Sequence, residues 1–321
     1  MNKGWLVSLG VLVLGAAATA RADAWPVKPV KAIVPISAGS VVDMVPRAVF
    51  EQLNVQLGQV IVVENRPGAG QTLGANIAAK AEPDGYTLFV NSSAHTIGPL
   101  LYANLGYHPT RDFTAVTTLG VTPFALVVPV DRGFRTVRDL VSSAGVKLNS
   151  FNFSSPGIGT ASHLSAERFR LSARVAAEHV PFKGGVEAMT EVIAGRVDFA
   201  FIALGAALPH IRAGRLVALA VNGQQRASAL PDVPTLREAG YTDAEYPTWV
   251  GLFVPARTPR AIVERLHRET AKALQDPGVK GKLDLLGVDP MVMTPAEFDA
   301  LVEKDLAINA ALVKAVGLKP Q

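Results

Sequence analysis

The chain of 321 residues contains no cysteine, which excludes disulfide bonds, thiolate catalysis and cysteine-based metal sites. Charged residues make up only 18% of the sequence, and the formal net charge of +4 comes from scattered lysines and arginines. Because they form no basic run, we expect no nucleic-acid partner. Beyond the N-terminus, no apolar run is long enough to span a bilayer. The length is enough for two domains, each with an apolar core.

Residues 1–22 have the pattern of a secretory signal peptide. Lys3 provides the positive start, residues 5–18 form a short apolar run, and Ala20-Arg21-Ala22 matches a small-x-small cleavage site. We therefore expect an exported mature chain that begins near Asp23, with an uncleaved N-terminal anchor as the alternative.

Short apolar strands alternate with amphipathic helices along the mature chain, which is typical of a largely parallel α/β architecture. Expected strands include 60–64, 86–91, 124–129, 197–203 and 216–221, and expected helices include 74–81, 136–143, 185–194, 259–275 and 295–316. We expect two similar lobes, in which residues 23–123 plus 226–321 form a discontinuous lobe 1 and residues 124–225 form lobe 2.

Two loops of small residues each connect an expected strand to an expected helix. The first contains Ser37, Ala38, Gly39 and Ser40, and the second runs from Ser154 to Thr160. A helix N-terminus carries unpaired N–H groups and partial positive charge, and small residues let an anion approach them. Two such ends facing each other across a cleft would clamp a ligand with a carboxylate at each end. Either loop taken alone is also compatible with an ordinary strand-to-helix turn.

Other candidate chemistry is weaker. Gly68, Gly70 and Gly74 form a glycine string after a strand, but residues 65–67 intervene and no acidic residue ends the next strand. We therefore interpret the string as a structural loop and expect no cofactor. The six histidines show no metal-ligand spacing, so we expect no metal either.

Individual side chains near the loops leave alternatives open. Asp43 lies in the first helical turn, where its carboxylate favours the helix dipole, and we prefer that structural role to a water-mediated ligand contact. Lys183 is either a cation near the cleft or a solvated loop lysine. Ser154 or Ser155 could act with His163 as nucleophile and base, which makes an exported hydrolase of carboxylate esters or amides an alternative. No acidic residue orients His163 in a recognisable motif.

Long motifs follow one another along the mature chain. They are VENRPGAGQTLGANIAAKAEPDGYTL at 63–88, SSPGIGTASHL at 154–164, VPFKGG at 180–185, ALPHIRAGRLVALAV at 207–221 and ALPDVPTLREAGY at 229–241. Together they resemble the Bug (Bordetella uptake gene) family, the substrate-binding receptors of tripartite tricarboxylate transporters.

The resemblance implies a two-lobed periplasmic binding protein of the type II, or Venus flytrap, topology. It implies a monomeric receptor that captures a small carboxylate between its lobes and delivers it to a membrane permease formed by a large and a small transmembrane subunit. Carried over by position, the expected ligand-binding residues are Ile36, Ser37, Ala38, Gly39, Ser40, Val41, Asp43, Ser92, Ser93, Ser154, Ser155, Gly157, Gly159, Thr160, His163, Phe182, Lys183, Ile202 and Ala203.

Several departures from the family pattern make the expected cleft more apolar. They are Ile36, Val41, Val42, Phe182 and the pair Ile202-Ala203, where relatives usually carry aromatic, small polar, tyrosine and Asp-Asn residues. An apolar pocket rejects hydroxylated or amino-bearing ligands, whose polar groups would stay unpaired. We therefore expect an aromatic dicarboxylate such as terephthalate ahead of citrate or an amino acid, with adipate as the nearest rival. A chemosensory ligand-binding protein is a further alternative.

Overall fold

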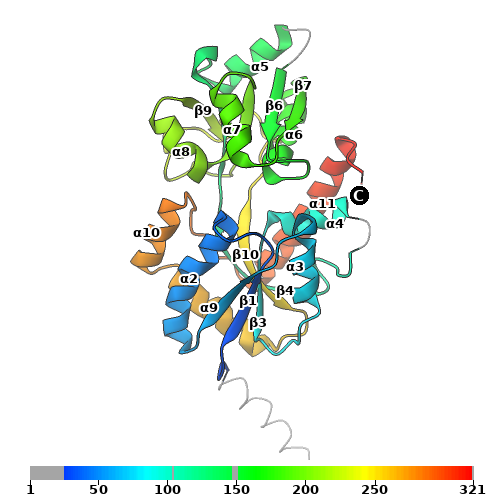
Figure 1. Ribbon diagram of the computed structural model, residues 1–321, viewed down its shortest axis with the longest axis vertical. Coiled ribbons are helices and arrows are strands. Elements are labelled where there is room, and N and C mark those ends of the chain that lie inside the picture. The colour runs from blue at the N-terminus through cyan, green and yellow to red at the C-terminus, as the bar shows by residue number, and fades with distance from the viewer. Residues whose placement is uncertain (1–24, 103–104, 147–150, 320–321) are drawn as a thin grey trace, which may run out of the picture.

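The computed structural model describes residues 25–102, 105–146 and 151–319 and contains two lobes, seen one above the other in Figure 1. The expected signal peptide lies outside these residues. Each lobe is built on one five-stranded sheet flanked by helices, so the predicted two-lobed α/β fold is confirmed. No helix in the described ranges has the length and apolarity to cross a membrane.

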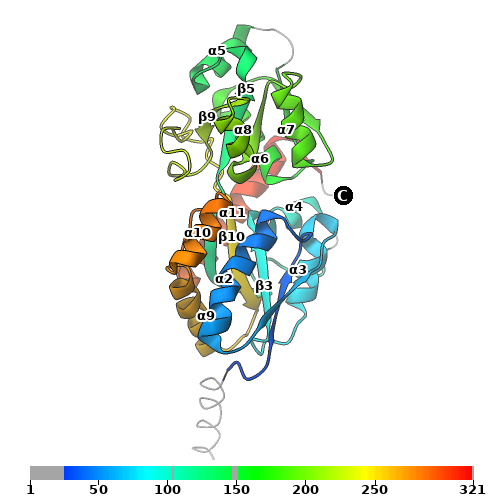
Figure 2. The ribbon, with the colours of Figure 1, turned by 60° about the vertical axis from the view of Figure 1, so that its left-hand side comes forward.

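Lobe 1 holds the sheet β2-β1-β3-β10-β4. Its strands are β1 (Val30–Val34), β2 (Ile61–Asn65), β3 (Thr87–Ser92), β4 (Phe113–Val121) and β10 (Trp249–Pro255). Side chains alternate between the two faces of β1: Ala32 and Val34 pack against α2 (Val41–Leu57), α9 (Arg260–Ala273) and α10 (Pro277–Leu285). Ile33 packs with α3 (Thr72–Ala79) and α11 (Pro295–Ala315) on the other face. Figures 1 and 2 show α2 and α9 on one side of the sheet and α3 on the other.

Lobe 2 holds the sheet β7-β6-β8-β5-β9. Its strands are β5 (Phe124–Pro129), β6 (Phe151–Ser155), β7 (Ala177–Pro181), β8 (Phe199–Ala203) and β9 (Leu216–Val221). One face packs against α5 (Val137–Val146) and α6 (Ala161–Ala173), and the other against α7 (Gly185–Ile193) and α8 (Leu204–Arg212). Short helices η1 (Ala69–Gln71), η2 (Ser93–Thr96), α4 (Gly98–Leu101) and η3 (Val130–Arg132) complete the described elements.

In each sheet four strands run in one direction and the fifth runs the opposite way. The reversed strands are β10, which pairs antiparallel with β3 and β4, and β5, which pairs antiparallel with β8 and β9. Both are the strands by which the chain enters a lobe from the other lobe. They therefore start at the edge where the remaining strands end, which accounts for their reversed direction.

Segments 121–124 and 246–249 carry the chain between the lobes, and residues 222–226 are hydrogen-bonded beside them; all three are called the connecting segments below. Residues between the second and third pack on lobe 2, since Leu236 and Ala244 belong to one of its apolar clusters and Ala227 to the other. These contacts favour a return of the chain to lobe 1 at β10, later than the expected boundary at residue 226. The stretch contains no long strand or helix, so no periodic pattern in the sequence marked where the chain returns to lobe 1.

A small apolar cluster bridges the lobes beside the connecting segments. Leu312 of α11 and Ile97, which follows η2, pack with Leu164 of α6, and Leu101 of α4 adds to the contact. The C-terminal helix thus belongs to the sheet of lobe 1 and also touches lobe 2.

Candidate functional site

Loop 1 joins β1 to α2 and is shaped around the N-terminus of that helix. Ser40 is the N-cap, and its hydroxyl oxygen accepts a hydrogen bond from the Asp43 N–H at 3.3 Å. The Asp43 carboxylate reaches back and accepts the Gly39 N–H at 2.8 Å. Gly39 has a φ of 84°, a left-handed conformation that favours glycine.

Asp43 is buried and fully engaged inside lobe 1. Its oxygens also accept hydrogen bonds from Arg47 Nε at 3.0 Å and from Asn65 Nδ2 at 2.8 Å. Burial alone would raise the pKa of Asp43, but the hydrogen bonds from Arg47, Asn65 and Gly39 lower it below its ordinary value. The carboxylate is therefore ionised at neutral pH, and Arg47 compensates its charge.

Loop 2 joins β6 to α6 and repeats this arrangement in lobe 2. Thr160 is the N-cap, and its hydroxyl accepts the His163 N–H at 3.3 Å and donates to the Gly157 carbonyl at 2.8 Å. His163 Nδ1 accepts the Gly159 N–H at 3.1 Å. Gly159 has a φ of 77°, close to that of Gly39.

A second histidine, His179 on β7, contacts both His163 and Ser155 and so supports loop 2. The rings of His163 and His179 stack with centroids 4.0 Å apart, and His179 Nε2 lies 2.6 Å from the hydroxyl of Ser155. That hydroxyl also accepts the Gly157 N–H at 3.1 Å, which fixes the turn. Burial, the neighbouring His179 and Arg170 lower the pKa of His163 to about 3, and burial lowers the pKa of His179 to about 4. Both rings are neutral at pH 7.

The serine and histidine expected as a hydrolase pair are not paired. Ser154 donates to the Ala188 carbonyl at 2.9 Å, and Ser155 contacts His179. His163 instead accepts the Gly159 N–H. His179 was missed by the sequence reasoning because no motif marks it. The parallel pairing of β6 with β7, which sets Phe153 opposite His179, is the signal that could have found it.

The remaining predicted residues fall into two groups by burial. Exposed or partly exposed are Ile36, Ser37, Ala38, Val41 and Val42 at loop 1 and its helix, and Ser92, Phe182, Lys183 and Ala203 at or after the ends of other strands. Ile36, Val41 and Val42 also pack against the core of lobe 1. Ile202 is only 5% exposed and belongs to a core cluster of lobe 2, and Ser93 is buried.

The two helix N-termini have the same donors available. Because each N-cap hydroxyl binds the third N–H of its helix, the first two are left: those of Val41 and Val42 in α2 and of Ala161 and Ser162 in α6. None of these four donates to another group among the described residues. Figure 1 shows both loops on the edges where the lobes face each other. Two pairs of N–H groups at helix ends can hold two anionic groups of one ligand.

The lobes touch close to loop 2. A Cβ added at Gly159 would lie 2.2 Å from Leu101 Cδ1 of α4, so this glycine allows lobe 1 to approach the loop. A second contact between the lobes lies at Gly205, at the start of α8 in lobe 2. It packs against the backbone of Leu286 and Gly287 of lobe 1, where an added Cβ would meet the Leu286 carbonyl at 2.4 Å. The loops are thus flanked by interlobe contacts that leave no room for a larger side chain.

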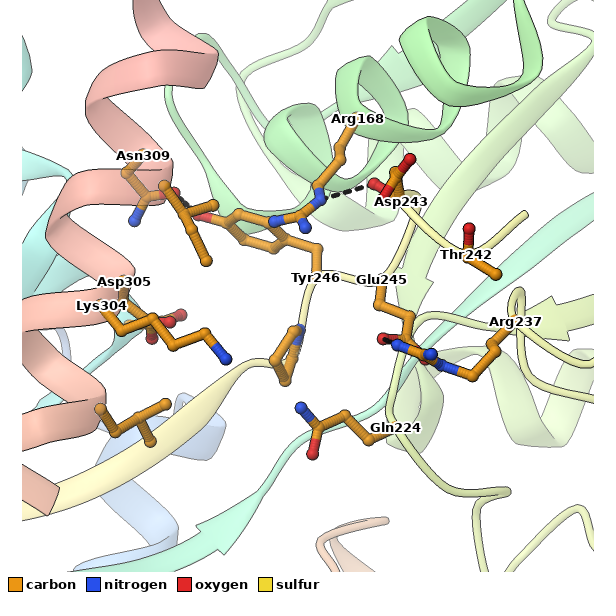
Figure 3. A pocket seen from close by; sticks show the side chains of 14 residues that line it. Arg168, Gln224, Arg237, Thr242, Asp243, Glu245, Tyr246, Lys304, Asp305 and Asn309 are labelled. Carbon is orange, nitrogen blue, oxygen red and sulfur yellow. Dashed lines mark hydrogen bonds and ion pairs between the residues drawn. The ribbon is translucent and has the colours of Figure 1, made fainter. Parts of the chain in front are cut away.

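Two cavities lie at the connecting segments rather than at the loops. The larger has a volume of about 530 Å³ and the smaller about 220 Å³. Figure 3 shows the smaller one, where Arg168 from lobe 2 and Lys304 from α11 project toward the same space around Tyr246. Tyr246 donates to Asn309 Oδ1 of α11 at 2.8 Å, and Arg168 of α6 donates to the Asp243 carbonyl at 2.8 Å, so both lobes hold the wall of this cavity.

A family model and individual relatives identify the same protein family. The family model "Tripartite tricarboxylate transporter family receptor" matches residues 45–318. A UPF0065 protein encoded in the tcbD-tcbE intergenic region of Pseudomonas sp. (strain P51) is 37% identical over 269 residues, which cover 84% of this chain and 80% of that protein. Protein BugT of Bordetella pertussis is 30% identical over 316 residues, covering 98% and 97%.

Solved structures agree with the sequence comparisons. The periplasmic binding protein BugD is 30% identical with a TM-score of 0.76, covering 92% of this chain and 100% of its own. Rpa4515 of R. palustris, solved with adipate, is 30% identical with a TM-score of 0.79 and the same coverage. MatC from Rhodopseudomonas palustris, solved with malate, is 31% identical with a TM-score of 0.75, covering 90% and 100%.

Proposed function

Because this chain belongs to the family of tripartite tricarboxylate transporter receptors, we propose that it captures a dicarboxylate between loops 1 and 2. The matched proteins are receptors and periplasmic binding proteins, so the chain is a binding protein of the periplasm and the hydrolase alternative is dropped. Cleavage of the signal peptide near Ala22 and a monomeric state are part of the proposal.

The observation that carries the proposal is the pair of matched helix ends. Each offers two adjacent backbone N–H groups and a partial positive charge to a carboxylate. Lobe 2 presents a neutral His163 there, and lobe 1 compensates Asp43 with Arg47, so neither end repels an anion. Relatives solved with adipate and malate bind ligands with a carboxylate at each end.

The choice of ligand follows from how the loop hydroxyls are used. The hydroxyls of Ser40, Ser155 and Thr160 take part in hydrogen bonds that shape the loops, and the Ser154 hydroxyl donates to the Ala188 carbonyl of α7. A ligand hydroxyl or amino group would therefore find few unused side-chain partners and would lose its bonds to water. We propose a dicarboxylate with an apolar body, terephthalate first and adipate second, ahead of citrate or glutamate.

Calorimetry on residues 23–321 tests this order. Terephthalate should bind more tightly than citrate or glutamate, and benzoate, which lacks one carboxylate, should bind at least about tenfold more weakly, because two charge-assisted hydrogen bonds are lost. Tighter binding of citrate or glutamate would overturn the ligand proposal. Equal affinity for benzoate and terephthalate would overturn the two-ended clamp.

Binding between lobes is expected to favour a closed arrangement that the membrane partner recognises, a permease of a large and a small transmembrane subunit. Small-angle scattering with and without the bound carboxylate measures this directly. The radius of gyration should fall on binding, and superimposable curves would argue against closure.

A further inference from the structure

The larger cavity is walled by the parts of the chain that join the lobes. All three connecting segments contribute to it, together with Ser228, Leu301 of α11 and four residues before that helix, Asp289, Pro290, Met291 and Met293. Its volume of about 530 Å³ lies within the range of small-molecule sites. No residue of loops 1 and 2 takes part in this lining.

Hydrogen bonds bind the connecting segments to one another around the cavity. The Thr122 N–H donates to the Thr248 carbonyl at 2.8 Å, and the Thr248 hydroxyl donates back to the Thr122 carbonyl. Asn222, which is fully buried, accepts the Phe124 N–H at 2.8 Å and donates to the Tyr246 carbonyl at 2.7 Å. A rotation of one lobe against the other must therefore move the wall of this cavity.

The outer wall joins the two lobes in a second way. Residues 289–293 are fixed to β4 of lobe 1, where the Thr118 and Thr117 hydroxyls donate to the carbonyls of Met291 and Met293, each at 2.8 Å. From the stretch that packs on lobe 2, the Ser228 hydroxyl donates to the Asp289 carboxylate. Both lobes thus hold the same wall.

The lining indicates which molecule would fit. Most of it is apolar, with Val121, Pro123, Pro247, Pro290, Met291, Met293 and Leu301. Its charged groups already have partners, since Arg226 pairs with Glu238 at 2.8 Å and Asp289 accepts from Ser228. Gln224 and Gln225 are exposed, and within the described part of the chain their side-chain amides make no hydrogen bond to protein groups, so they are free to turn toward a ligand. A neutral molecule with one amide-like group matches this set, whereas a carboxylate would be desolvated without a new cationic partner.

We propose that this cavity is a second ligand site, which takes a neutral apolar molecule with one amide-like group and is coupled to the rotation of the lobes. Flexible Met291 and Met293 let the wall adapt to such a ligand. The site differs from the cleft in both position and ligand charge.

The experiment uses 2-naphthamide as the probe and calorimetry on residues 23–321. We expect a dissociation constant of about 0.1–1 mM, typical of a ligand this small, and at least fivefold weaker binding of 2-naphthoate, its charged isostere. Met293→Trp fills the cavity and should lower the affinity at least tenfold. Val292→Trp is the matched control, because Val292 lies between the two methionines, is 39% exposed and does not line the cavity; it should change the affinity less than twofold.

Leu301→Trp repeats the block from α11, so the test does not depend on the folding of one variant. Absence of binding, equal losses in Met293→Trp and Val292→Trp, or preference for 2-naphthoate would overturn the site. Binding that persists with terephthalate in excess would separate it from the cleft.

The coupling rests on the proposed function, because it needs a cleft ligand. Saturation with 2-naphthamide should change the affinity for terephthalate at least threefold, and terephthalate should change the affinity for 2-naphthamide by the same factor. Unchanged affinities in both directions would overturn the coupling. Failure of terephthalate to bind would refute the cleft ligand while leaving the direct binding of 2-naphthamide as a separate result.

Discussion

Loops 1 and 2 have the same pattern of backbone hydrogen bonds but use different side chains as acceptors. In both, an N-cap hydroxyl accepts the N–H three residues on, and the side chain at that residue accepts the N–H of the preceding glycine. Loop 1 uses the carboxylate of Asp43 with Arg47 beside it, whereas loop 2 uses the neutral imidazole of His163. The turn requires a hydrogen-bond acceptor at this position, and a charged or a neutral side chain can supply it. The charge near the helix N-terminus can therefore differ between the lobes.

The largest expected difference between the loops comes from their glycines. Both have a positive φ, so alanine costs roughly 1–2 kcal/mol at either position. At Gly159 a Cβ also meets Leu101 at 2.2 Å, whereas at Gly39 nothing lies within 4 Å. We expect Gly159→Ala to lower the free energy of unfolding by about 2–4 kcal/mol and Gly39→Ala by about 1–2 kcal/mol, measured by urea denaturation.

The control for this pair removes the obstructing side chain. Adding Gly159→Ala to a Leu101→Ala background should cost no more than Gly39→Ala does in the wild type. Equal losses for the two glycines in the wild type would show that Leu101 exerts no constraint on loop 2.

The next largest difference in stability is expected when the acceptor side chains, Asp43 and His163, are replaced. Asp43→Asn removes charge-assisted hydrogen bonds inside lobe 1 and should cost about 2–3 kcal/mol, whereas His163→Gln removes a neutral one and should cost about 1 kcal/mol. Urea denaturation of both variants at pH 7 makes the comparison. A larger loss for His163→Gln would mean that the stacked imidazoles stabilise loop 2 more than their hydrogen bonds indicate.

The two loops should also respond to pH in different windows. The folded pKa values of His163 and His179 are about 3 and about 4 against an ordinary 6.5. Below pH 6.5 the unfolded chain therefore binds protons that the folded chain does not, and stability falls as the pH falls. Asp43, with a pKa lowered from 3.8, contributes stability above that pH and loses it as the pH falls through the folded value.

Unfolding free energies measured between pH 7 and pH 3 separate the two effects. The double variant His163→Gln/His179→Gln should reduce the slope between pH 6.5 and about 4, because it removes both imidazoles. Part of the slope should remain, because burial also lowers the pKa of His95 in lobe 1 to about 4. Asp43→Asn should leave that slope intact and differ in shape from the wild type only below pH 3.8. An unchanged slope in the double variant would contradict the neutral state of the two rings.

The smallest expected effects come from the N-caps. Ser40→Ala should cost about 1 kcal/mol. Thr160→Ala should cost slightly more, because the Thr160 hydroxyl also donates to Gly157. Thermal unfolding midpoints of both variants test this ranking, and a reversed order would show that the bond to Gly157 adds nothing.

Features set by neighbouring residues in the chain could be predicted from the sequence better than features set by long-range contacts. The strand-to-helix loops and the helix that begins at Pro295 follow from residue types near each other in the chain, so the sequence alone could predict them. The role of His179 depends on which strand lies beside β6, and the packing of residues 227–244 on lobe 2 depends on tertiary contacts. Ile202 was expected at the cleft, but whether its side chain faces the core depends on the register of β8, which the sequence pattern leaves open.

The reversed strand β10 has a consequence for how the molecule assembles during synthesis. Lobe 2 draws its sheet from one uninterrupted stretch, residues 124–221, and its strands can pair as soon as that stretch is made. Lobe 1 begins earlier but lacks the strand between β3 and β4 until residues 249–255 arrive, so the edge of β3 stays open meanwhile. The lobe that starts the chain is therefore the last to be finished, and the edge of its sheet stays open while the neighbouring lobe is made.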